Sequence, residues 1–396
     1  MSVDGDESGG RFPPFQSAGQ IMASLKNIIT AVTGLILTVF LGFMFGQPAR
    51  ALTFNITYDS SVTSQTNAAQ ITNAFSVATQ TLQALYTNSS SLNITCYWGA
   101  VGPFSGGIGL GASQTEALPY SYVQITNALR ATRTTLADSN SVASLPASDP
   151  TGGPWYVALA EAKAMGISTL DGSMYSANNN TISDGDVSFA SDVSYNFNPT
   201  NRAAVFGNYD FIAVVEHEIT EVMGRTTFDL EESGDYVPYD LFRFTAGGTR
   251  SFLANDNNVY FSVNNGVTAL KYFNPNDGGD IQDWTSSTPP DSYDAYISNG
   301  QIGRLSSADL TALDVIGYKL NFSAPRLTGT ALANGNFKIG FTNVTGMNFV
   351  ILATTNLSLS TSNWTNLGTP VESPAGQYQF TDTHANNARF YRVSLP

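Results

Sequence analysis

Cysteine, histidine and charged side chains are all scarce in this chain of 396 residues. Cys96 is the only cysteine, so no disulfide can form within the chain and a cysteine-based metal site is excluded. The only histidines are His217 and His384, which excludes a metal site with three histidine ligands. Charged residues make up 12% of the chain, against about 25% in average soluble proteins. We therefore expect the fold to depend on core packing, with Cys96 as a small buried residue.

Basic residues are also few, since 17 Lys and Arg stand against 31 Asp and Glu, for a net charge of −14. Phosphate binding requires clustered Lys and Arg, so we expect no nucleic-acid partner. No basic run is present that would attract anionic lipid. An acidic chain with many neutral polar residues is compatible with cation binding and with an extracellular surface.

The first 51 residues have the features of an export signal. Residues 28–45 are apolar and uncharged, Lys26 precedes them, and Ala49 and Ala51 supply the small residues of a cleavage site. We expect cleavage after Ala51, with Met22 as the true start. A retained membrane anchor is the alternative, because about 18 apolar residues can nearly span a bilayer. The protein is accordingly expected to be secreted or displayed at the cell surface, with membrane contact only through this segment.

Hydrophobic periodicity predicts an α+β domain over residues 52–322, followed by an all-β sandwich over residues 323–396. Strands are expected at 52–58, 92–98 and 186–197, and helices at 67–86, 118–136, 154–165, 209–224 and 306–316. Short alternating runs separated by turn residues are found at 337–341, 348–353, 377–381 and 389–393. These runs predict the β sandwich.

The helix expected at 209–224 carries the chemistry. His217 and Glu221 are four residues apart, so they share one helix face and could ligate one metal ion. Glu218 lies beside them, where it could act as general base on a metal-bound water. This is the spacing of H-E-x-x-H zinc peptidases with Glu in the fifth position. The alternative is an ordinary helix with a solvated patch of Glu216, Glu218 and Glu221.

Five ordered motifs resemble a group of bacterial secreted proteins regarded as metallopeptidases. The motifs are EHEITEVMGR at 216–225, YDLFRF at 239–244, GGDIQDW at 278–284, DAY at 294–296 and DLTALDVIG at 309–317. The resemblance implies a zincin-like catalytic domain, a zinc ion and peptidase activity. Gly224 matches the glycine that ends the active helix of metzincin-type peptidases, but Thr227 stands where their third histidine would be.

The third metal ligand is expected to be a carboxylate. Asp240, in the YDLFRF motif, is the first choice and Asp229 the second, while Glu231, Glu232 and Asp235 are more typical of loop charges. The alternative for Asp240 is an ion pair with Arg243 or Arg225. Oxyanion donors could come from Tyr236, Tyr239 or Arg225.

The sequence thus predicts a zinc metallopeptidase that hydrolyses bonds in proteins or peptides with His217, Glu221 and Asp240 as ligands and Glu218 as base. Acidic loops at 178–186, 256–258 and 274–283 could bind structural Ca²⁺, with plain turns as the alternative. A secreted adhesin or binding protein with a structural metal is the rival function, and a metal hydrolase acting on an ester or glycan is another. The C-terminal module resembles fibronectin-III-like or immunoglobulin-like modules through Trp364 and the run at 389–393.

Overall fold

The computed structural model describes residues 52–167, 182–199, 202, 206–227, 234–275, 277–383 and 389–395. These residues form both helices and strands, which confirms the α+β class. None of the helices in this part of the chain combines the length and apolar character needed to cross a bilayer. The export segment, Asp229, Glu231, Glu232 and His384 lie outside the described residues.

A four-stranded sheet of order β1-β2-β6-β3 supports the candidate site. Its strands are β1 (Thr53–Tyr58), β2 (Ser91–Trp98), β6 (Gly185–Phe189) and β3 (Gly111–Thr115). The first three are parallel, whereas β3 pairs antiparallel with β6 and lies at the edge. Alternate residues of β2 are buried, Cys96 among them, as the sequence predicted. One face of this sheet is therefore available for helices to cover.

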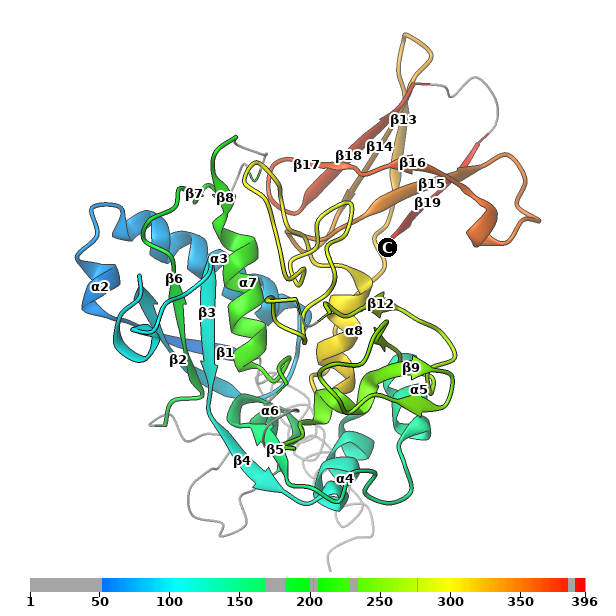
Figure 1. The fold of residues 1–396 in the computed structure, drawn as a ribbon. Coiled ribbons are helices and arrows are strands. Elements are labelled where there is room, and N and C mark those ends of the chain that lie inside the picture. The colour runs from blue at the N-terminus through cyan, green and yellow to red at the C-terminus, as the bar shows by residue number, and fades with distance from the viewer. Residues whose placement is uncertain are drawn as a thin grey trace, which may run out of the picture. The chain divides into compact units, whose positions relative to one another are not determined.

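Helices α3 (Ala68–Leu85) and α7 (Phe211–Val222) pack against each other, and α7 also contacts β3 and β6 (Figure 1). In α3 the apolar residues at helical spacing are buried, including Ile71, Phe75 and Leu82. In α7 every residue except His217 is buried. The glutamates of α7 are therefore held inside the protein and do not form a solvated patch.

Two predicted helices are partly wrong. The segment 118–136 contains β4 (Ala117–Tyr120) before α4 (Tyr122–Thr132) and the start of α5 (Leu136–Ser144). The segment 154–165 begins as β5 (Trp155–Ala158) and only then becomes α6 (Leu159–Met165). Strands β4 and β5 pair with each other, and this long-range pairing outweighs local helical spacing.

The predicted strand at 186–197 is also interrupted, because β6 ends at Phe189 and a bend precedes the short strand β7 (Tyr195–Asn196). Strand β7 pairs in parallel with β8 (Tyr209–Asp210), which leads directly into α7. A second sheet follows α7, with order β10-β9-β11-β12. Its strands are β9 (Arg243–Ala246), β10 (Thr249–Arg250), β11 (Tyr260–Phe261) and β12 (Lys271–Tyr272).

The long connection between β12 and α8 (Ser307–Val315) is drawn in yellow in Figure 1 and passes beside α7. Its described residues form isolated bridges but no named helix or strand. Helix α8 begins as predicted, since Ser306 and Asp309 form a capping box. The connection supplies the residues that complete the site.

The C-terminal part forms two further sheets, with orders β13-β14-β18-β17 and β16-β15-β19. The strands are β13 (Thr328–Ala331), β14 (Phe337–Thr342), β15 (Val350–Thr354), β16 (Thr365–Gly368), β17 (Val371–Glu372), β18 (Gln377–Asp382) and β19 (Phe390–Ser394). The alternating runs of the sequence therefore become β14, β15, β18 and β19. Phe337 of β14 stacks on Tyr391 of β19, which joins the two sheets through their side chains.

Candidate metal centre

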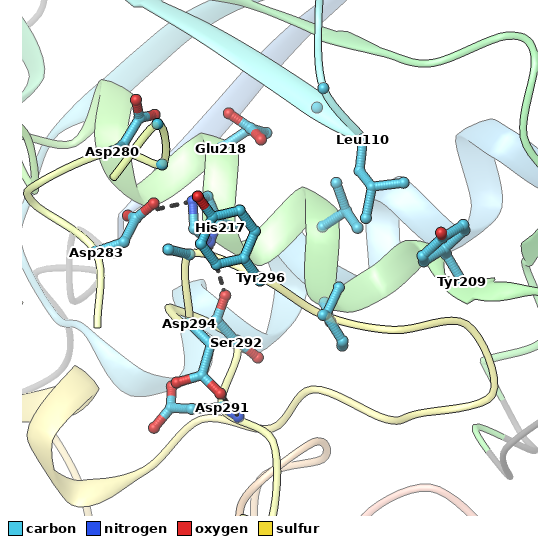
Figure 2. A pocket seen from close by; sticks show the side chains of 18 residues that line it. Leu110, Tyr209, His217, Glu218, Asp280, Asp283, Asp291, Ser292, Asp294 and Tyr296 are labelled. Carbon is cyan, nitrogen blue, oxygen red and sulfur yellow. Dashed lines mark hydrogen bonds and ion pairs between the residues drawn. The ribbon is translucent and has the colours of Figure 1, made fainter. Parts of the chain in front are cut away.

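His217 projects from the middle of α7, and each of its ring nitrogens faces oxygen atoms of neighbouring residues (Figure 2). Its Nδ1 lies 2.9 Å from the backbone oxygen of Ser292, which can only accept a hydrogen bond. A proton on Nδ1 therefore leaves the lone pair of Nε2 free to bind a metal ion, as in the metal-ligating form of the imidazole. Nε2 lies 3.5 Å from Oε1 of Glu221 and 3.3 Å from Oδ1 of Asp283.

These distances suit a tetrahedral ion. Zinc–nitrogen and zinc–oxygen bonds of about 2.0–2.2 Å place the ligand atoms of a tetrahedron roughly 3.3–3.6 Å apart. The ligand atoms of His217, Glu221 and Asp283 all lie within 4.8 Å of one another. At this separation the lone pairs of the three ligand atoms repel one another unless a cation or a proton lies between them.

Asp283 replaces Asp240 as the third member of the group. Asp240 is fully buried within the turn η2 (Pro238–Phe242), where its Oδ2 accepts the backbone N–H of Val237 at 2.9 Å. Burial raises the pKa of Asp240 to about 7, although the charge of Arg243 opposes that shift. Asp240 thus lies outside the candidate ligand group, and it forms no ion pair with Arg243 or Arg225 among the described residues, although the charge of Arg243 acts on it.

Asp283 was missed because no regular spacing connects it to α7. It lies 66 residues after His217 in sequence, inside the long connection, and its position follows from the folding of that connection. The one available signal was the GGDIQDW motif, whose last acidic residue is Asp283. The acidic loop at 274–283 thus contributes a candidate ligand to the site at α7.

Arg225 contacts the carboxylates of both Glu221 and Asp283. Its Nη1 donates to Oδ1 of Asp283 at 2.6 Å, and its Nη2 lies 3.4 Å from Oε1 of Glu221. Nη2 also donates to the backbone oxygen of His217 at 3.1 Å, and the guanidinium lies 4.3 Å from the ring centre of Tyr293. Arg225 is fully buried, so this planar donor fixes the carboxylates in place.

Glu221 has further hydrogen bonds that hold its carboxylate. Oγ of Ser113 in β3 donates to Oε2 at 2.7 Å, and Nε2 of Gln282 donates to Oε1 at 3.1 Å. Burial alone would raise the pKa of Glu221, but the hydrogen bond with His217 and the charge of Arg225 lower it to about 2. Glu221 is therefore ionised and able to bind a cation at neutral pH.

His217 carries the opposite shift. Burial favours the neutral ring, but the charge of Asp283 and the hydrogen bonds to Asp283 and Glu221 together outweigh it and raise the pKa of His217 well above its usual value. When no metal is bound, this raised pKa favours a proton on Nε2, between the ring and the carboxylates. A metal ion that binds there must displace this proton.

Glu218 faces the open space beside α7. Its side chain is 6% exposed, lines two neighbouring cavities, and forms no hydrogen bond or ion pair with the described residues. Burial and the charge of Glu221 raise the pKa of Glu218 well above its usual value. Gly111 of β3 makes room for it, since a Cβ there would lie 2.2 Å from Oε1 of Glu218.

The first cavity is a cleft of about 410 Å³ alongside His217 (Figure 2). The second, of about 500 Å³, extends along β3 from Gly111 to Thr115. Glu218 and Asp280 line both. Of the predicted oxyanion donors, Tyr239 is buried against Phe273 and Tyr236 packs on Trp155, so neither tyrosine lines either cavity.

Thr227 stays outside the ligand group, and its Oγ1 lies 3.3 Å from Oε1 of Gln282. Glu216, the third glutamate of α7, points to another side of the helix. Its Oε2 accepts the hydroxyl of Ser292 at 2.9 Å. Comparisons with known proteins identify no relative, since no family model, no curated protein and no solved structure matches the chain.

Proposed function

We propose that this protein is a secreted zinc metallopeptidase with a zincin-like catalytic domain and a fibronectin-III-like C-terminal module. The residues that would hold zinc are His217, Glu221 and Asp283. The observation that carries the proposal is the incompleteness of this group, which has three candidate protein ligands and an adjoining cleft. Three protein ligands beside open space are the arrangement of catalytic zinc sites, whereas structural sites are closed by four.

The donor set fits zinc. One neutral imidazole nitrogen and two carboxylate oxygens are borderline-to-hard ligands that zinc accepts. When bound, zinc would supply a Lewis acid that polarises a carbonyl group and makes water more acidic. The chain itself provides the remaining functions, which are to hold the substrate, to move a proton and to exclude bulk water.

Glu218 is suited to move the proton. Its carboxylate lines the cleft beside His217, so it can accept a proton from water there and later release it to the leaving amine. Burial and the charge of Glu221 raise the pKa of Glu218, which makes its carboxylate a stronger base for accepting that proton.

Strand β3 is suited to hold a peptide. It is the edge strand of its sheet, antiparallel to β6, and its residues line the second cavity. An extended peptide can pair with the unpaired backbone groups of an edge strand, and this mode needs no particular side chains. The preference for a peptide over an ester or a glycan rests on this strand.

One observation favours a different function. Arg225 already forms ion pairs with both carboxylates, so the group could be a buried salt-bridge network in a secreted binding protein without catalysis. Metal content separates the two functions, because a salt-bridge network requires no ion.

The first test is elemental mass spectrometry of the purified protein and its variants. We expect about one zinc per chain in the wild type, as the three-ligand site implies. His217→Ala should lose the metal, and His384→Ala, the matched change at the other histidine, should retain it. Glu218→Gln should keep zinc and lose nearly all hydrolysis of a casein substrate. A wild-type protein without stoichiometric metal would exclude the peptidase function.

A further inference from the structure

The cleft beside His217 is walled by carboxylates. The acidic residues that line it are Glu218, Asp280, Asp283, Asp291 and Asp294. Neither this cleft nor the cavity along β3 has a Lys or Arg among its lining residues in the described part of the chain. A negative wall without cations attracts positively charged groups, and the low-dielectric surroundings strengthen that attraction.

Two of these carboxylates are balanced by internal cations. Asp283 is bound to Arg225 at 2.6 Å, and Asp291 to Lys271 at 2.9 Å. Asp294 instead accepts the backbone N–H of Ser287 at 2.9 Å and of Asp291 at 3.0 Å, and these hydrogen bonds add no charge. Burial and the charge of Asp291 raise the pKa of Asp294 to about 6, so above that pH Asp294 adds a negative charge to the lining of the cleft.

Glu218 and Asp280 are the acidic residues that line both cavities and form no ion pair within the described chain. Glu218 is more than nine-tenths buried and faces the cleft without a hydrogen-bond partner. Asp280 is exposed, so a ligand can reach it. Desolvation by the surrounding cleft and the charges of Glu221 and Asp283 raise the pKa of Asp280 to about 6, and a cation beside it would oppose that shift.

The cleft keeps an excess of negative charge when the charge of a bound metal ion is included. That charge has to be included at any metal site. A divalent cation held by Glu221 and Asp283, with Arg225 behind them, leaves one positive charge. Asp280 and Asp294, whose pKa values of about 6 leave them ionised above that pH, together outweigh that charge without any contribution from Glu218. The cleft also has an apolar side, formed by Leu110, Val214 and Ile297 among others, which suits the aliphatic stem of a long basic side chain.

We infer that this cleft selects peptides that carry lysine or arginine beside the bond to be cleaved, and that Asp280 determines this specificity. The inference rests on the proposed peptidase function. Asp280 lies where the two cavities meet, so it can reach a basic residue on either side of the bond. The same charges disfavour acidic residues at these positions, which adds to the discrimination.

Turnover tests the specificity directly. The substrates are quenched fluorescent peptides that differ only in Lys, Gln or Glu on either side of one bond. We expect kcat/KM for the Lys peptides to exceed that for the Glu peptides by at least about tenfold at low salt, within the range of one close charge pair. Asp280→Asn should reduce this ratio severalfold. Asp192→Asn, which removes an exposed charge outside both cavities, should leave it unchanged.

Binding separates failure of this inference from failure of the proposed function. Fluorescence anisotropy would compare labelled Lys and Glu peptides on Glu218→Gln protein, with and without Asp280→Asn. A Lys preference that depends on Asp280 supports the inference even if the wild type cleaves nothing. Equal binding of the two peptides, or a preference that Asp280→Asn leaves intact, overturns it. A preference that fades with rising salt identifies its origin as electrostatic.

Discussion

Arg225 distinguishes this site from a plain cluster of acids. Glu in the fifth position of the motif adds a negative charge that an H-E-x-x-H site lacks, and alone it would make a bound zinc ion a weaker Lewis acid. Arg225 offsets that charge, since it contacts both Glu221 and Asp283. A zinc ion held by neutral His217, Glu221 and Asp283, with the charge of Arg225 included, would have the same net charge as zinc with two neutral histidines and one carboxylate. The negative charge that Glu221 adds to the H-E-x-x-H pattern is therefore offset by Arg225, four residues later in the chain.

The assignment of Asp283 in place of Asp240 gives the sharpest prediction for single residues. Asp283→Asn removes a charged candidate ligand and should weaken zinc binding by at least about tenfold, the lower end of what even outer partners contribute. Asp240→Asn is the matched change at a buried carboxyl whose raised pKa already favours a neutral form. It should keep zinc affinity near the wild-type value. Competition with a chromogenic chelator measures the zinc affinity of both variants. If Asp240→Asn weakens zinc binding and Asp283→Asn does not, Asp240 is the ligand after all.

At the scale of elements, the sequence predicted what local patterns determine. Helices α3, α7 and α8 were predicted because their apolar spacing and, for α8, the capping box of Ser306 act within one segment. Strands β4 and β5 were missed because they depend on pairing across about 40 residues. The candidate site divides in the same way. The sequence predicted that α7 carries His217, Glu218 and Glu221. Asp283 instead lies in the connection between β12 and α8, which has no periodic pattern from which its position could be predicted.

The packing of α5 against α8 makes a prediction about pH. Asp314 of α8 lies near Asp138 of α5 and accepts the hydroxyl of Thr135 at 2.5 Å. Burial, together with the charge of Asp138, raises the pKa of Asp314 from 3.8 to about 7. The folded state then binds a proton that the unfolded state has released. The free energy of unfolding should therefore fall as pH rises from about 4 to about 7.

Asp314→Asn should remove part of this dependence. The amide keeps an oxygen for Thr135 and carries no charge at any pH. We expect the variant to be more stable than the wild type at pH 8, by about 1–3 kcal/mol given about 1.4 kcal/mol per pKa unit. Urea unfolding at pH 4.5 and pH 8 measures the difference. Equal gains at both pH values would mean that the charge of Asp314 is not responsible.

At the scale of the whole molecule, residues of the C-terminal part connect to the candidate site through a chain of buried groups. Gly346 packs on the guanidinium of Arg202, which donates to Asp210 at 2.8 Å and lies 3.8 Å from Glu216. Glu216 binds the hydroxyl of Ser292, whose backbone oxygen orients His217. Nearby, Arg304 donates to Glu372 of β17 at 2.6 Å. Through these contacts the C-terminal part packs against residues that support the candidate site.

Two glycines of that module provide a matched pair to test the connection. Gly346 and Gly335 have nearly the same backbone angle, φ of 78° and 82°. A Cβ at Gly346 would lie 2.5 Å from Nη1 of Arg202, whereas a Cβ at Gly335 would meet nothing within 4 Å. Alanine at either position incurs the strain of a positive φ, which costs about 1 kcal/mol. Only alanine at Gly346 also displaces the buried guanidinium.

We therefore expect Gly346→Ala to lower the melting temperature more than Gly335→Ala and, unlike it, to weaken zinc binding severalfold. Arg202 cannot simply move aside, because it is buried and bound to Asp210 and to the backbone oxygen of Gly303. Its displacement would pass to Glu216 and Ser292, and so to the ring of His217. Calorimetry and chelator competition on the two variants measure these effects. If Gly346→Ala lowers stability but leaves zinc affinity at the value of Gly335→Ala, the module stabilises the fold without positioning the metal ligand.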